Sequence, residues 1–153
     1  MKTHVLESSI WLPRPIDQVF AFFSDAFNLE MLTPPFLNFH VLTPGPIAMR
    51  PGARIRYRLR LHGIPIGWES EITEWNPPHK FVDEQLSGPY RRWHHEHRFA
   101  SRDSGTDVSD HVEYSVLGGA LVNRFFVARD VRAIFAYRKQ KLTAQFPPQG
   151  LAR

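Results

Sequence analysis

Cysteine is absent from the 153-residue chain. Its absence excludes disulfide frameworks, thiolate zinc sites and cysteine nucleophiles. No apolar run approaches the roughly 18 residues that a membrane-spanning helix needs, and Glu7 lies where a signal peptide would have its apolar core. We therefore expect a soluble, cytoplasmic protein with no membrane span.

Glycine-rich phosphate loops, nucleophile elbows and kinase signatures are also missing from the sequence. The composition, with 42% hydrophobic and 22% charged residues, is that of a globular protein, and the length predicts one domain. We place this domain at residues 1–146 and expect residues 147–153 to form a flexible tail. The formal net charge of +4 makes nucleic acid or an anionic membrane surface worth considering.

The hydrophobic periodicity divides the chain into one strand, two short helices, six further strands and a long helix. Strands are expected over residues 3–12, 36–43, 53–61, 66–75, 80–87, 91–99 and 106–117. Helices are expected over residues 15–24, over 25–32, and over about 25 residues after Gly118 and Gly119. This order predicts an α+β fold in which helices pack on one face of an antiparallel sheet.

Strand parity restricts how the strands pair, because residues directly opposite each other must point to the same face. If residues 62–65 form a turn, Tyr57 opposes Ser70 on the inner face and Arg58 opposes Glu69 on the outer face. The same register pairs Leu59 with Trp68, Ile55 with Ile72, and Arg56 with Glu71. Carboxylates then balance much of the arginine row, so we expect no nucleic-acid partner.

The same parity places His95 and His97 together on the inner face of strand 91–99. Asp83 of the preceding strand and Asp110 of the following strand each lie opposite one of these histidines, and two registers remain open for each. A carboxylate beside an imidazole favours the imidazolium and can fix its tautomer, whereas burial opposes the charge. We therefore predict that these groups are close together, without a direction for their pKa shifts.

Four interpretations of this cluster stay open. It can be a hydrogen-bonded network that fixes the register, a group that orients a ligand, an acid/base pair, or a metal site built on the His-x-His motif. We favour the first two and predict no metal and no cofactor. Arg138 interrupts the apolar stripe of the last helix, so it needs an ion-pair partner, water at its head group, or a ligand carboxylate.

Several motifs occur together along the chain. They are Pro15-Ile16-Asp17-Gln18-Val19-Phe20-Ala21-Phe22 with Asn28-Leu29-Glu30, then Trp68-x-Ser70-x-Ile72-x-x-Trp75-x-Pro77-Pro78, Phe81-Val82-Asp83-Glu84-Gln85-x-x-Gly88-Pro89-Tyr90, Trp93-x-His95-x-His97-x-Phe99, and the long C-terminal helix. In these motifs nearly the whole chain resembles the START-like superfamily, also called the Bet v 1-like or SRPBCC group, and in particular its bacterial polyketide cyclase/dehydrase and lipid-transport members.

The resemblance implies a helix-grip fold. In this fold a curved seven-stranded antiparallel sheet wraps around the long helix, two short helices follow the first strand, and a cavity lies between sheet and helix. Members include ligand binders, receptors and cyclases, so the fold alone does not choose a function. The resemblance implies no catalytic residue set for this chain.

We therefore predict that the protein binds a small hydrophobic or aromatic ligand, such as a lipid, a polyketide or an isoprenoid-like molecule. The cavity should measure on the order of a few hundred cubic ångströms. The expected ligand-binding residues are Tyr57, Trp68, Phe81, Asp83, Gln85, Trp93, His95, His97, Tyr114 and Phe135. The loops Thr33–Phe36 and Gly88–Tyr90 could gate its mouth.

Two alternatives from other functional classes remain. One is a cyclase or dehydratase for a polyketide-like substrate, with His95 or His97 as general acid/base and Asp83 and Asp110 as their partners. The other is a protein-interaction module that uses the outer sheet face, which offers charge but little apolar area. The sequence also leaves a homodimer open.

Overall fold

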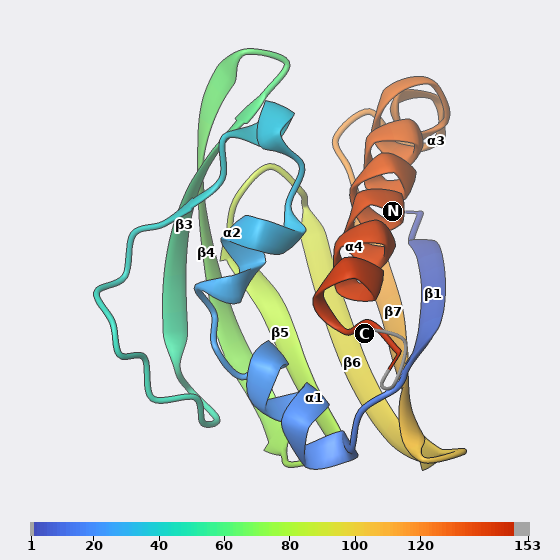
Figure 1. Ribbon diagram of the computed structural model, residues 1–153. Coiled ribbons are helices and arrows are strands. Elements are labelled where there is room, and N and C mark those ends of the chain that lie inside the picture. Colours follow the sequence, from blue (N-terminus) through green and yellow to red (C-terminus); the bar gives the residue numbers. More distant parts are fainter. Residues whose placement is uncertain (1, 149–153) are drawn as a thin grey trace.

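The computed structural model describes residues 2–148, except for the side chains at positions 125 and 126 (Figure 1). Its strands are β1 (His4–Leu12), β2 (His40–Val41), β3 (Arg54–Leu61), β4 (Ile64–Asn76), β5 (Lys80–Ser87), β6 (Arg92–Arg102) and β7 (Gly105–Ser115). Its helices are α1 (Ile16–Phe23), α2 (Asn28–Leu32), the 3-10 helix η1 (Pro35–Leu37), α3 (Gly119–Val122), the π-helical turn η2 (Asn123–Val127) and α4 (Ala128–Gln145). Residues 149–153 of the expected tail lie outside the described residues.

The strands form one seven-stranded antiparallel sheet in the order β1-β7-β6-β5-β4-β3-β2. The helices lie on one face of this sheet (Figure 1). Helix α1 packs against β6 and β7, and α4 packs against α2 and β1. The predicted helix-grip architecture is therefore confirmed. Among the described residues, no helix is both long and apolar enough to cross a membrane.

The hairpin between β3 and β4 corrects the predicted register. Its turn consists of His62 and Gly63 alone, whose φ angles of 49° and 81° are both positive, as a tight two-residue hairpin turn requires. Tyr57 consequently opposes Trp68, so the register based on a turn over residues 62–65 is wrong by one two-residue step. The other observed pairs are Ile55 with Ser70, Leu59 with Ile66, Arg56 with Glu69, and Arg54 with Glu71.

A shift of two residues leaves every side chain on its predicted face. Along β3, Ile55, Tyr57 and Leu59 are buried, whereas the intervening arginines are exposed. The arginine row still faces glutamates of β4, as in the 3.4 Å ion pair between Arg54 and Glu71.

The predicted strand over residues 36–43 is wrong for most of its length. Pro35 fits the start of a helical turn, because proline has no N–H to satisfy there, and η1 forms instead. Asn38 ends this turn with a φ of 44°, which leaves only His40–Val41 paired with β3. Helix α2 also starts later than predicted, at Asn28.

The long C-terminal helix follows Gly118 and Gly119 as predicted, with α3, η2 and α4 running on without a break. Its buried stripe in α4 consists of Val131, Phe135, Arg138 and Leu142. Two apolar clusters make up the core. One lies around Phe20 of α1, and the other lies under α4 around Val131.

Candidate functional site

A cavity of about 140 Å³ lies between the sheet and the helices α2, η1 and α4. The sheet supplies aromatic rings from Tyr57 and Trp68, and α2 and η1 supply Leu32 and Leu37. The cavity is smaller than the few hundred cubic ångströms predicted, because rings such as Tyr90 and Trp93, with centroids 4.7 Å apart, pack along its wall. A space of this size accommodates about one aromatic ring.

Seven of the ten expected ligand-binding residues line this cavity. They are Tyr57, Trp68, Asp83, Trp93, His95, His97 and Phe135.

The other three expected residues pack behind the wall and serve the structure in ways that the motifs did not indicate. Phe81 stacks on His97, with ring centroids 4.0 Å apart. Gln85 holds the loop between β5 and β6, because its amide donates to the carbonyl of Tyr90 at 2.7 Å and its oxygen accepts the Tyr90 N–H at 3.2 Å. Tyr114 donates its hydroxyl hydrogen to Asn123 Oδ1 at 2.8 Å and so ties β7 to η2.

His95 and His97 project side by side from β6 into one wall of the cavity. Residues two apart on a strand share a face, so their rings can stack, and the ring centroids lie 3.7 Å apart. Both side chains are buried, with 5% and 3% of their surface exposed. Burial at this level requires polar partners for the ring nitrogens.

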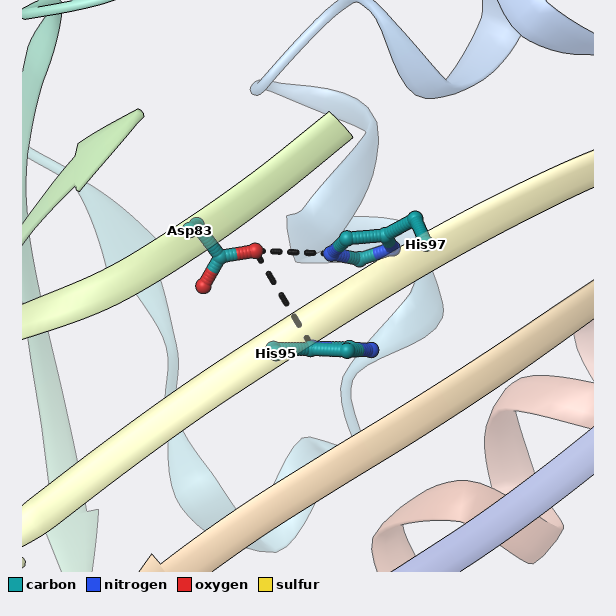
Figure 2. Close-up of side chains that lie close together, drawn as sticks. All are labelled: Asp83, His95 and His97. Atoms are coloured by element: carbon teal, nitrogen blue, oxygen red, sulfur yellow. Dashed lines mark hydrogen bonds and ion pairs between the residues drawn. The ribbon is translucent and has the colours of Figure 1, made fainter. Parts of the chain in front are cut away.

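Two carboxylates from the neighbouring strands supply these partners. Asp83 of β5 opposes His95 in the ladder, but its Oδ2 lies 2.7 Å from His97 Nε2 and 4.0 Å from His95 Nδ1 (Figure 2). Asp110 of β7 opposes His97, but its Oδ1 lies 2.8 Å from His95 Nε2 and 3.4 Å from His97 Nδ1. Each carboxylate therefore bonds the histidine diagonal to its ladder partner. The predicted closeness of the four groups is observed.

Arg138 brings a cation to the same wall from α4. Its Nη2 lies 3.5 Å from Asp110 Oδ1, and its guanidinium lies 5.2 Å from the ring centroid of Phe23 and 5.8 Å from that of Phe135. Its Nε and Nη2 atoms are buried and make no hydrogen bond within the described part of the chain. The sequence had marked Arg138 as an interruption of an apolar stripe, and the structure adds it to the cavity lining.

The buried surroundings set the protonation of this cluster. Burial and the neighbouring His95 lower the pKa of His97 to about 4, against the opposing effect of its hydrogen bond to Asp83. Burial by itself would raise the pKa of Asp110, but Arg138 and His95 outweigh it and hold that pKa below its ordinary value. The pKa of Asp83 is also lowered, since the hydrogen bond from His97 and the nearby His95 overcome the effect of burial. At neutral pH the carboxylates are thus ionised, and a neutral His97 donates to Asp83.

His95 has a ring nitrogen available to a ligand. Asp110 holds its Nε2, whereas the 4.0 Å between its Nδ1 and Asp83 exceeds hydrogen-bond length. An imidazole that donates its Nε2–H to a carboxylate in this way presents the lone pair of Nδ1 to a ligand atom in the cavity.

Sequence reasoning predicted Phe135 of α4 in the wall but missed the other apolar residues that the helices contribute to it. Leu32 and Leu37 reach the cavity from α2 and η1, and Ile134 reaches it from α4. Apolar residues in a short helix indicate burial but not the space that they border. From the two loops considered as gates, Thr33 and Tyr90 line the cavity.

Comparison with known proteins adds three observations. The family model described as "Polyketide cyclase / dehydrase and lipid transport" matches residues 12–139. Among the curated proteins, none matches this sequence. Many solved structures match the fold of this chain.

The Zhui aromatase/cyclase from Streptomyces sp. R1128 is 15% identical, with a TM-score of 0.73 over 94% of this chain and 93% of that chain. The ginseng major latex-like protein 151 from Panax ginseng is 11% identical, with a TM-score of 0.70 over 95% and 99%. Protein Ms6760 from Mycobacterium smegmatis is 19% identical, with a TM-score of 0.68 over 92% and 89%. At these identities the similarity shows a shared fold.

Proposed function

Because the chain belongs to the polyketide cyclase/dehydrase and lipid transport family, we propose that it binds a small aromatic or otherwise hydrophobic molecule between its sheet and α4. The observation that supports this proposal is the ring-lined cavity of about 140 Å³ with one polar wall. Such a combination of apolar walls and a few convergent polar groups is typical of small-molecule sites. This cavity favours ligand binding over protein interaction through the outer sheet face.

The polar wall suggests how the ligand is oriented. A ring would lie against Trp68 and Phe135, and a ketone oxygen of the ligand would accept a hydrogen bond from the guanidinium of Arg138. Because His95 Nε2 donates to Asp110, a hydroxyl of the ligand would instead donate to His95 Nδ1. A carbonyl or phenol oxygen suits this wall better than a carboxylate, because two ionised carboxylates, Asp83 and Asp110, are already buried there.

Acetophenone, one ring with one ketone, is a suitable probe. Calorimetric titration of the full chain should show binding at one site. Ile134→Trp should abolish binding, because Ile134 lines the cavity and a larger side chain fills it. Ala136→Trp is the matched control, since Ala136 is exposed on the same helix and should leave binding unchanged. Equal binding by both variants would show that the probe binds outside the cavity.

Acid/base catalysis is a second candidate function, and the orientation of His95 by Asp110 supports it. A base at the ketone would speed exchange of the acetophenone methyl protons with deuterium, which NMR measures directly. His95→Gln should then remove exchange while acetophenone still binds. Exchange no faster than in buffer would leave ligand binding as the function.

A further inference from the structure

We propose that Asp83, His95 and His97 form a binding site for one divalent transition-metal ion of the zinc class. One ligand atom from each residue lies within 4.8 Å of the others. Figure 2 shows the carboxylate of Asp83 approaching both imidazoles, which project from the neighbouring strand. This proposal departs from the sequence-based prediction of no metal, and it goes beyond the organic ligand proposed above.

The spacing between Asp83 and each of the two histidines is close to what such an ion requires. Zinc binds imidazole nitrogen and carboxylate oxygen at about 2.0 to 2.2 Å, so neighbouring ligand atoms around a tetrahedral ion lie roughly 3.3 Å apart. The distances from Asp83 Oδ2 are 2.7 Å to His97 Nε2 and 4.0 Å to His95 Nδ1, which bracket this value. The imidazoles of His95 and His97 are stacked, with centroids 3.7 Å apart and 25° between their planes, so binding one ion requires the rings to turn until both nitrogens face it. The paired strands β5 and β6 hold the three backbones in place during this turn.

Asp110 provides the outer support that metal-binding histidines normally have. Such histidines usually donate their second ring N–H to a carboxylate, which fixes the tautomer. Here the Oδ1 of Asp110 lies 2.8 Å from Nε2 of His95 and 3.4 Å from Nδ1 of His97, the two nitrogens that would not face the ion. One buried carboxylate is therefore placed to hold both imidazoles.

An unpartnered nitrogen supplies independent support. His97 Nδ1 is buried and has no hydrogen-bond partner within the described residues. The other ring nitrogen, Nε2, is hydrogen-bonded to Asp83, and Nδ1 lies 3.4 Å from Asp110 Oδ1. If Nε2 bound a metal ion, the proton would sit on Nδ1 and could be donated to Asp110. Metal binding at Nε2 thus gives the buried Nδ1 a hydrogen-bond partner in Asp110.

Charge and access also suit a cation. Asp83 and Asp110 bring two negative charges to the cluster, and Arg138 brings one positive charge close to Asp110. All three proposed ligands line the cavity, so a water molecule or a ligand oxygen could complete the coordination. Two nitrogens with one oxygen suit zinc-class ions, whereas Mg²⁺ and Ca²⁺ prefer all-oxygen sites.

The test is titration of the full chain, first stripped with a chelator, with Zn²⁺ by calorimetry and with Co²⁺ by visible absorption. We expect one ion per chain, with no comparable heat from Mg²⁺. Asp110→Asn should weaken Zn²⁺ binding about 10- to 100-fold, as expected for an outer carboxylate. Asp83→Asn should weaken it further, because it removes a direct ligand.

The matched control is His111→Gln. His111 also pairs with a carboxylate, Glu7, at 2.9 Å, but this pair is exposed and lies apart from the cluster. This variant should bind Zn²⁺ as tightly as the unaltered chain. Loss of binding in His111→Gln, or full binding in Asp83→Asn, would overturn the proposal.

The Co²⁺ spectrum and the Ile134→Trp variant separate loss of the metal site from misfolding and from loss of ligand binding. If Asp83→Asn fails to fold, Asp110→Asn and the Co²⁺ spectrum of the unaltered chain decide, and a spectrum of free aqueous Co²⁺ counts against the site. Ile134→Trp should lose acetophenone and keep Zn²⁺, so failure of the metal proposal is distinguishable from failure of the binding proposal. Acetophenone binding without Zn²⁺ binding would refute the metal site alone.

Discussion

Arg138 is a buried cation on the otherwise apolar stripe of α4, and Asp110 is the carboxylate that it faces. Arg138→Met keeps the length of the side chain and leaves Asp110 without this charge, so we expect a loss of about 3 kcal/mol in the free energy of unfolding. Adding Asp110→Asn should recover part of that loss, because no unpaired charge then stays buried. Urea unfolding of the two single variants and the double variant measures the coupling.

Arg129→Met is the control for this cycle, because Arg129 is exposed on the same helix. Its effect should stay within about 0.5 kcal/mol. Strictly additive losses in the double variant would show that Arg138 and Asp110 do not interact.

Tyr90 gives a prediction for alkaline pH. Burial raises the pKa of its phenol above 10.0, and the neighbouring Tyr114 and Asp130 add to the increase. Above about pH 10 the phenol of the unfolded chain ionises, whereas the phenol of the folded protein stays neutral. The free energy of unfolding is therefore unaffected by this group below about pH 10 and decreases as the pH rises further. The loss is at most about 1.4 kcal/mol per pH unit for one such group.

Tyr90→Phe removes the titrating hydroxyl and keeps the ring. The free energy of unfolding of this variant should fall less steeply between about pH 10 and 11 than that of the unaltered chain. Chemical unfolding at several pH values measures both slopes. Identical slopes would show that the phenol is not protected from ionisation in the fold.

Among the elements, the hairpin of β3 and β4 depends on a turn with positive φ angles, which are unfavourable for residues other than glycine. Gly63 has a φ of 81°, and a Cβ there would meet no atom within 4 Å, so Gly63→Ala tests backbone conformation alone. We expect a loss of about 1 kcal/mol in the free energy of unfolding. Thermal or urea unfolding measures it.

Gly67 is the matched position within β4. A Cβ at Gly67 also meets no atom within 4 Å, but its φ lies outside the left-handed region. Gly67→Ala should therefore be neutral or slightly stabilising, since alanine restricts the unfolded chain. Equal losses at both glycines would contradict the strain assigned to the turn.

The same hairpin shows how far element-level prediction reaches. The alternation of apolar residues and arginines in β3 was enough to assign each side chain to a face. It could not choose between turns of two and four residues, because both keep the parity. The choice depended on His62 adopting positive φ, which its residue type does not require. The strand predicted over residues 36–43 was wrong for a different reason. There the alternating pattern indicated a strand, but Pro35 started a helical turn.

For the whole molecule, both core clusters share one sheet, so they should unfold together. Phe20 packs with Phe81 and Phe99 in one cluster, and Val131 belongs to the other. Phe20→Ala should cost about 3 to 5 kcal/mol and Val131→Ala about 2 kcal/mol. Each variant should show a single transition in which tryptophan fluorescence and far-UV circular dichroism coincide. Separate transitions would show that the clusters unfold independently.

The sequence by itself determined the order of the elements, the inner and outer faces of most strands, and the gathering of His95 and His97 with two carboxylates. These features follow from periodicities within one strand or helix and from pairing between neighbouring strands. The tertiary structure decided which carboxylate bonds which histidine, that Arg138 faces Asp110, and that α2 and η1 form part of the wall of a cavity of about 140 Å³. These features depend on turn length, on side-chain direction and on how separate elements pack, and no local pattern in the chain encodes those distances.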